Sequence, residues 1–171
     1  MHSGMIGWYP VLGEENIMDI AQYKELIERH FRFLSNNEKY SMVRTLETSS
    51  FGNLLVEYQS QEIILRITLD KSQVIIDIKP KSSAGDSWFG LSSLVDYVAP
   101  ELGGFKYVIP EKWNDYDVMI EQQVKYLGEV LRKYCGLILS GRFSNWKEVE
   151  EMRAKKAENE YRKLTGRDYP L

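Results

Sequence analysis

Residues 53–79 read NLLVEYQSQEIILRITLDKSQVIIDIK, and this stretch decides the fold. Runs of aliphatic and β-branched residues alternate with polar ones and are separated by short polar turns, which is typical of β-strands. Connections this short join only antiparallel neighbours. With a similar segment at about 40–47, the stretch predicts a four-stranded antiparallel meander. Its principal aliphatic face is expected to carry these residues: Ile63, Leu65, Ile67, Leu69, Val74, Ile76 and Ile78.

The turns also predict the register of the sheet. If Lys71-Ser72 is a two-residue hairpin loop, Arg66 lies opposite Asp77, and opposite charges meet across the strands. If Ser60-Gln61 closes the preceding hairpin, Glu57 lies opposite Ile64 and diagonal to Arg66. A four-residue loop at 49–52 then extends a line of charge over all four strands. This line is expected to contain Arg44, Glu57, Arg66 and Asp77.

Helical periodicity appears on both sides of the predicted meander. Four helices are expected, over about 19–34, 91–98 and 117–139 and from about 144 to 164. Asn145 followed by Glu148 resembles a capping box, and Gly166 is a typical helix stop. The predicted fold class is therefore α+β, a four-stranded antiparallel meander packed with about four helices. Leu55, Ile64 and Ile75 on its second face predict that this face is partly covered.

The composition excludes several classes of protein. A hydrophobic content of 43% in 171 residues suffices for one domain with a core. The net charge of −3 argues against a nucleic-acid partner. Cys135 is the only cysteine, so internal disulfides and cysteine zinc sites are excluded. The sequence contains no apolar run long enough to span a membrane, and we expect a cytoplasmic protein.

The first 17 residues differ from the rest, because they show neither the helical nor the strand periodicity of apolar residues. Glycine and proline interrupt both patterns, at Gly4, Gly7, Pro10 and Gly13. Codons for Gly13-Glu14-Glu15 can resemble a bacterial ribosome-binding sequence ahead of Met18. One hypothesis is that residues 1–17 are a translated leader and that residues 18–171 form the domain. The alternative is an N-terminal arm, disordered or capping an apolar surface with aromatic residues.

Few residues suggest catalysis. Of the two histidines, His2 lies in the suspected leader and His30 lies at the edge of a helix stripe. Cys135 lies on a predicted helix, where a buried, inert thiol is expected. No nucleophile motif accompanies either residue, and no catalytic residue, metal ligand or cofactor is assigned.

A cluster of carboxylates opens the predicted helix near residue 117. Asp115, Asp117 and Glu121 could bind Mg²⁺ or Ca²⁺ through oxygen, as in a small-ligand or divalent-metal-dependent enzyme. The simpler interpretation is that these side chains cap a helix N-terminus.

Aromatic side chains close to acidic residues are typical of protein-binding surfaces. The candidate partner-binding residues are Trp88, Phe105, Tyr107, Trp113, Asp115 and Tyr116. They predict a non-enzymatic protein-binding domain with a protein partner, although anchoring of loops to the core explains some of these aromatic residues equally well. The oligomeric state is left open.

Two long stretches carry a resemblance. VRTLETSSFGNLLVEYQSQEIILRITLDKSQVIIDIKP at 43–80, followed by Trp88, is similar to a pattern in small uncharacterised bacterial proteins. YLGEVLRKYCGLILSGRFSNW at 126–146 resembles their helical tail. Some of these proteins are grouped with immunity proteins of polymorphic toxin systems. The resemblance implies a toxin-neutralising function, and no residue role is carried over from it.

Overall fold

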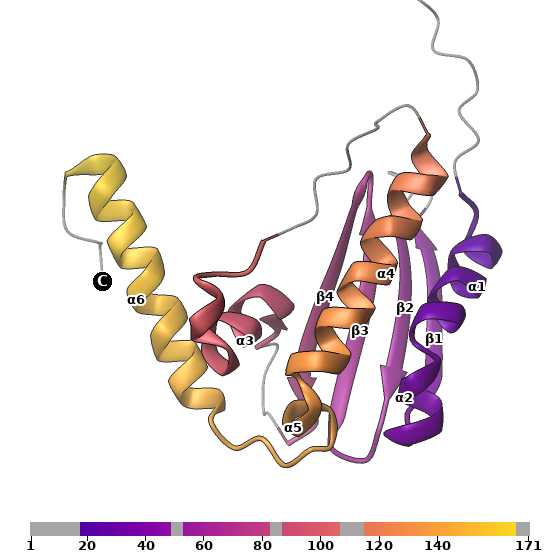
Figure 1. Ribbon diagram of the computed structural model, residues 1–171, viewed down its shortest axis with the longest axis horizontal. Helices are drawn as coiled ribbons and strands as arrows, with labels where there is room; N and C mark the ends of the chain where they lie inside the picture. Colours follow the sequence, from indigo (N-terminus) through magenta and orange to yellow (C-terminus); the bar gives the residue numbers. More distant parts are fainter. Residues whose placement is uncertain (1–17, 49–52, 83–86, 107–114, 167–171) are drawn as a thin grey trace, which may run out of the picture.

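The computed structural model describes residues 18–48, 53–82, 87–106 and 115–166. Residues 1–17, where the leader is predicted, lie outside this part of the chain. The sheet has the strand order β1-β2-β3-β4-β5 and is antiparallel throughout (Figure 1). Its strands are β1 (Ser41–Thr48), β2 (Asn53–Gln59), β3 (Ile63–Asp70), β4 (Gln73–Pro80) and β5 (Phe89–Gly90). The α+β class and the meander are therefore confirmed, and the two-residue β5 is an addition to the four predicted strands.

Six α-helices occur in the described residues, where about four were predicted. They are α1 (Ile20–His30), α2 (Arg32–Asn37), α3 (Leu91–Val98), α4 (Tyr116–Tyr134), α5 (Gly136–Leu139) and α6 (Trp146–Thr165). A 3-10 turn, η1 (Pro100–Leu102), follows α3. The larger number arises because the backbone leaves helical geometry at Phe31 and at Cys135, which divides two predicted helices into α1–α2 and α4–α5.

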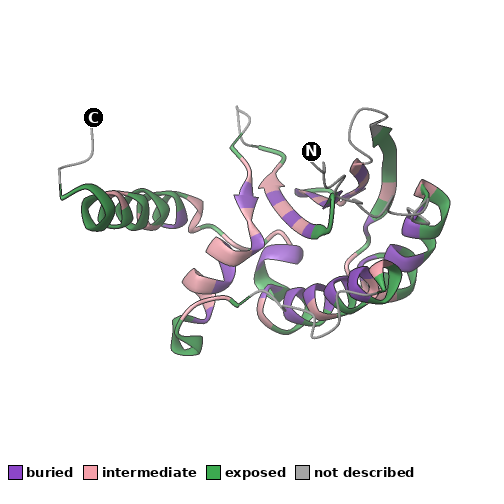
Figure 2. Ribbon diagram, turned by 90° about the horizontal axis from the view of Figure 1, so that it is seen from above, coloured by how far each residue is buried: buried purple, intermediate pink, exposed green. Residues whose placement is uncertain are grey.

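The core lies between one face of the sheet and the helices α1, α3 and α4 (Figures 1 and 2). Alternation along β2, β3 and β4 buries every second residue, as a period of two requires. The seven aliphatic residues predicted for the principal face of β3 and β4 are all buried. Residues on the second face are partly exposed, including Leu55, Ile64 and Ile75.

The register confirms most of the predicted pairs. Arg66 lies opposite Asp77, and Arg44 lies opposite Glu57 beyond a bulge between Met42 and Arg44. The predicted pairing of Glu57 with Ile64 is wrong, because Glu57 lies opposite Arg66.

The error in that pairing comes from the turn between β2 and β3. The Ser60 N–H donates to the Ile63 carbonyl at 3.0 Å, so the hairpin turns at Gln61-Glu62 instead of Ser60-Gln61. The Ser60 hydroxyl also accepts the Ile63 N–H at 3.1 Å. A turn placed one residue further along shifts every pair by two residues and preserves which face each side chain occupies.

The predicted capping box at the start of α6 is also wrong. Asn145 is the N-cap residue, but its side chain makes no capping hydrogen bond. Its Nδ2 donates instead to the Tyr97 hydroxyl at 2.9 Å, so the amide links α6 to α3. The capping box in the structure lies at α1, between Asp19 and Gln22.

Candidate functional site

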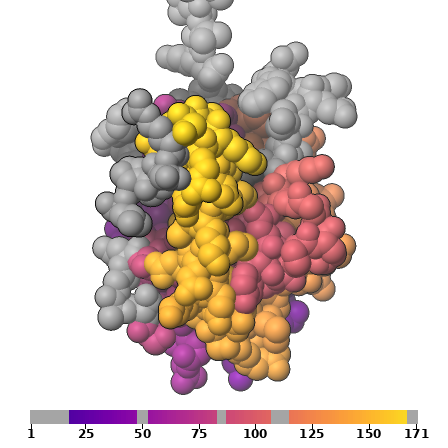
Figure 3. All heavy atoms as spheres, turned by 90° about the vertical axis from the view of Figure 1, so that its left-hand side faces the viewer, coloured from indigo at the N-terminus to yellow at the C-terminus, as the bar shows by residue number. Residues whose placement is uncertain are grey.

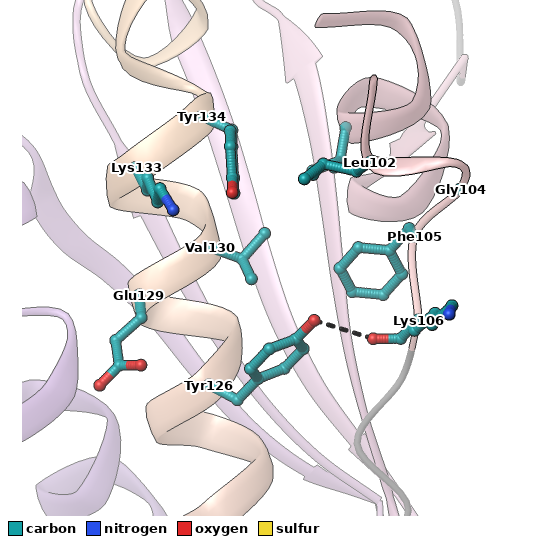
Figure 4. A pocket seen from close by; sticks show the side chains of 10 residues that line it. Leu102, Gly104, Phe105, Lys106, Tyr126, Glu129, Val130, Lys133 and Tyr134 are labelled. Atoms are coloured by element: carbon teal, nitrogen blue, oxygen red, sulfur yellow. Dashed lines mark hydrogen bonds between the residues drawn. The ribbon is translucent and has the colours of Figure 1, made fainter. Parts of the chain in front are cut away.

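A groove between α3–η1 and α4 is the candidate site (Figure 4). It has a volume of about 340 Å³, at the lower end of the usual range for ligand sites. We call it the α3–α4 groove, and its apolar lining consists of Val95, Leu102, Phe105, Tyr126, Val130 and Tyr134. The groove therefore has an aliphatic floor with aromatic rings on both walls.

Its two walls come from segments far apart in the sequence. Tyr126, Val130 and Tyr134 project from the same side of α4, because helix positions four apart lie above one another. The facing wall is the segment after η1, which turns through Gly103 and Gly104 at φ 68° and 106°. These positive values favour glycine, and they let the chain double back so that Phe105 faces α4.

Hydrogen bonds hold the walls in place. The Tyr126 hydroxyl donates to the Lys106 carbonyl at 2.9 Å (Figure 4). The rings of Phe105 and Tyr126 lie with their centroids 6.2 Å apart. The side chain of Lys106 points away from these rings (Figure 4), so its contribution to the groove is through the backbone.

Asp96 connects the groove to α6. One carboxylate oxygen accepts the Phe105 N–H at 2.7 Å, and the other lies 3.0 Å from the Lys156 ammonium. Only 14% of the Asp96 side chain is exposed. The aspartate therefore fixes the backbone at Phe105 and ties this wall to α6.

Lys133 supplies a positive charge beside the groove. Its ammonium lies 4.9 Å from the centre of the Tyr134 ring. A hydrogen bond with Tyr134 raises the pKa of Lys133. Glu129, four residues earlier on α4, also lines the groove, so charges of both signs border the apolar lining.

The predicted partner-binding residues lie in separate places. Phe105 lines the groove. Trp88 lies beside the second face of the sheet, where its ring contacts the Arg66 guanidinium and the Lys79 ammonium at 3.9 and 4.8 Å. Tyr107 and Trp113 lie outside the described residues.

Asp115 and Tyr116 lie at the start of α4. Asp115 is its N-cap and accepts the Val118 N–H at 3.2 Å. The Tyr116 hydroxyl donates to the Lys71 carbonyl in the β3–β4 turn. Both residues thus have structural contacts that fix the beginning of α4.

The three carboxylates considered for a metal site do not gather. Asp115 caps the helix and Asp117 is exposed on its first turn. Glu121 lies 3.1 Å from the Arg29 guanidinium, and His30 Nε2 lies 3.5 Å from the same oxygen without hydrogen-bond geometry. Among the residues that the structure describes, no group of three or more acidic, histidine or cysteine side chains could hold a metal ion.

Cys135 is buried, as predicted. Burial raises the pKa of its thiol to about 12. The reactive thiolate is therefore disfavoured at neutral pH, and the residue serves the core.

A scan against protein-family models found no match, and neither the curated proteins nor the solved structures gave one. Of the described helices, none is long and apolar enough to cross a membrane.

Sequence reasoning missed most of the groove. The helix that carries Tyr126, Val130 and Tyr134 was predicted, but none of these three residues was assigned to a site. Tyr126 and Tyr134 are only partly buried. The sequence did contain one indication of this groove. The two tyrosines lie at the side of an otherwise aliphatic stripe of α4, which is typical of a partly open contact surface next to the one that packs on the sheet.

Proposed function

We propose that this chain is a non-enzymatic protein-binding domain that takes one apolar side chain of its partner into the α3–α4 groove. The aromatic lining of the groove is the observation that carries this proposal. Partly buried aromatic walls around an apolar floor are typical of the pockets into which interface anchor residues insert. The resemblance to immunity proteins supports a more specific proposal, in which the partner is a toxin of the same bacterium.

The charge beside the groove defines the anchor further. Lys133 is exposed and lies next to Tyr134 at its edge. An aromatic or long aliphatic residue followed by an acidic residue would fill the lining and place a carboxylate near this ammonium.

Two matched peptides test the proposal. One is an acetylated pentapeptide amide with a central tryptophan between acidic residues, and the other has lysines in place of the acidic residues. We expect the acidic peptide to shift the amide NMR resonances of 95–106 and 126–134. Its dissociation constant should be on the order of 0.1–1 mM, because it fills only one side-chain site. The basic peptide should bind at least about tenfold more weakly.

Charge reversal on α4 provides the control. Lys133→Glu should abolish the preference for the acidic peptide. Arg132→Glu reverses an adjacent exposed charge that does not line the groove, so it should leave this preference unchanged. Equal binding of both peptides, or equal effects of both variants, would contradict the proposed anchor site.

A small-ligand protein is the second candidate, because a groove of about 340 Å³ is large enough for a small molecule. Indole-3-propionate offers the same ring and carboxylate without a peptide. If it binds more tightly than the acidic peptide, at the same resonances, the small-ligand function is favoured over protein binding. The carboxylates Asp115, Asp117 and Glu121, earlier considered for an enzyme, play no part in either candidate.

A further inference from the structure

The second face of the sheet carries charges in an order that repeats regularly across the strands. We call it the open face, because in the described chain α1, α2 and α4 lie on the other side of the sheet (Figure 2). The register aligns Arg44, Glu57, Arg66 and Asp77 in one row from β1 to β4. The signs in this row therefore alternate as plus, minus, plus, minus.

A second row beside the charges is mostly apolar. The same register aligns Leu46 with Leu55, Leu55 with Thr68, and Thr68 with Ile75. Leu46 is 37% exposed on the edge strand β1, and the other three are partly exposed. Aliphatic side chains that run across a whole sheet and keep contact with water favour a partner surface.

The surface of the open face is higher over β3 and β4 than over β1. The Trp88 ring lies against Arg66 and Lys79, which places it over β3 and β4. Arg153 of α6 donates to the Trp88 carbonyl at 3.0 Å and holds this segment in position. The face is therefore raised over β3–β4, whereas Arg44 and Leu46 on β1 are exposed.

From these features we propose that the open face binds a second copy of this chain, with the two sheets packed face to face about a twofold axis parallel to the strands. Such an axis places β1 of one copy over β4 of the other and reverses each row. Within each copy Glu57 and Arg66 already pair at 2.8 Å, and the Trp88 ring covers Arg66. The charge pairing between copies therefore rests on the ends of the row, where the exposed Arg44 faces Asp77 of the second copy. An isologous interface requires this kind of self-complementarity.

The apolar row and the raised position of Trp88 also fit this twofold arrangement. Leu46 faces Ile75 of the second copy, and the raised Trp88 of each copy lies over the lower β1–β2 region of the other. Aligned packing of two sheets is a common arrangement. A four-strand face projects on the order of 450 Å², so we expect a dimer weaker than those with standard interfaces.

Sedimentation equilibrium of the full chain tests this proposal at concentrations from about 1 to about 300 µM, a range that brackets micromolar association. We expect a monomer–dimer equilibrium within this range. Leu46→Glu places a charge in the apolar row and should weaken the dimer at least about tenfold. Leu164→Glu is the matched control on α6, where the leucine is 87% exposed, and should leave the equilibrium unchanged.

Charge exchange identifies the twofold pairing. Arg44→Asp places two carboxylates opposite each other and should also weaken the dimer at least about tenfold. Adding Asp77→Arg to Arg44→Asp should restore it, with thermal unfolding confirming that both variants fold. A monomer at every concentration, a dimer insensitive to Leu46→Glu and Arg44→Asp, or no restoration by the exchange would overturn the proposal. Lys133→Glu should not alter the dimer, so a failure of the groove proposal is distinguishable from a failure of this one.

Discussion

The two long helices of this molecule are nearly equal in length but opposite in burial. α4 has 19 residues and α6 has 20. α4 contributes eight buried residues, whereas Val149 is the only buried residue of α6. Figure 2 shows α4 against the sheet, while α6 extends away from it with an exposed surface along most of its length. Helical periodicity alone predicts a helix, whereas the width of its apolar stripe indicates how much of the helix packs.

α6 is attached mainly through its first turns. Trp146 packs against Phe89 and Phe143, with ring centroids 5.0 and 4.9 Å apart, and Phe143 packs on Tyr97. Further along, Figure 3 shows α6 lying on the surface beside α3. In proteins most of the stability of a helix comes from packing of its apolar face, so this aromatic cluster is the main apolar attachment of α6.

The same substitution on both helices should give the largest contrast. Leu131 of α4 is fully buried and Leu164 of α6 is 87% exposed. Leu131→Ala should lower the free energy of unfolding by about 2–5 kcal/mol, since it removes buried methyl groups and leaves a cavity. Leu164→Ala should change it by less than about 0.5 kcal/mol. Urea denaturation measures both, and similar losses would show that α6 packs more closely than described.

A smaller loss of unfolding free energy is expected where α4 is hydrogen-bonded to the β3–β4 hairpin. Gln123 accepts the Val74 N–H at 3.1 Å and donates to the Ser72 carbonyl at 2.8 Å. Gln123→Leu keeps the size but leaves the buried Val74 N–H without a partner, which should cost about 1–3 kcal/mol. Gln122→Leu changes the neighbouring exposed glutamine and should be nearly neutral. Equal unfolding free energies for the two variants would show that these bonds do not stabilise the hairpin.

Strand alternation made the sheet the most predictable part of the fold. A period of two assigns alternate side chains to opposite faces, and a two-residue turn moved by one residue preserves this assignment. The predicted faces are therefore correct despite the error at Ser60-Gln61. The turn itself was less predictable, because the Ser60 hydroxyl contributes to where the chain reverses. The fifth strand is too short to produce a recognisable alternation.

The candidate site was much less predictable than the sheet. Phe105 was identified from its aromatic character. The groove also depends on Tyr126 and Leu102, which come close to Phe105 only when α3 and α4 pack together. Asp96 gave no local indication of its role, since its two partners, Phe105 and Lys156, are nine and sixty residues away. Contacts over such separations are set by tertiary packing, which local patterns do not encode.

The smallest expected effect tests the polar attachment of α6. Lys156 pairs with Asp96 at 3.0 Å, but 59% of its side chain is exposed, so Lys156→Ala should cost no more than about 1 kcal/mol at neutral pH. The hydrogen bond with Asp96 raises the pKa of Lys156 above its ordinary value of 10.5. A cation with a raised folded pKa stabilises the fold below its unfolded pKa, and this contribution is lost as the pH rises through the folded pKa. The difference between wild type and Lys156→Ala should therefore shrink as the pH rises above 10.5 and through the raised pKa, where the ammonium is lost. Lys155→Ala, an exposed neighbour without a described ion pair, should show no such dependence, and a pH-independent difference at Lys156 would assign its effect to packing of the side-chain stem instead of the charge.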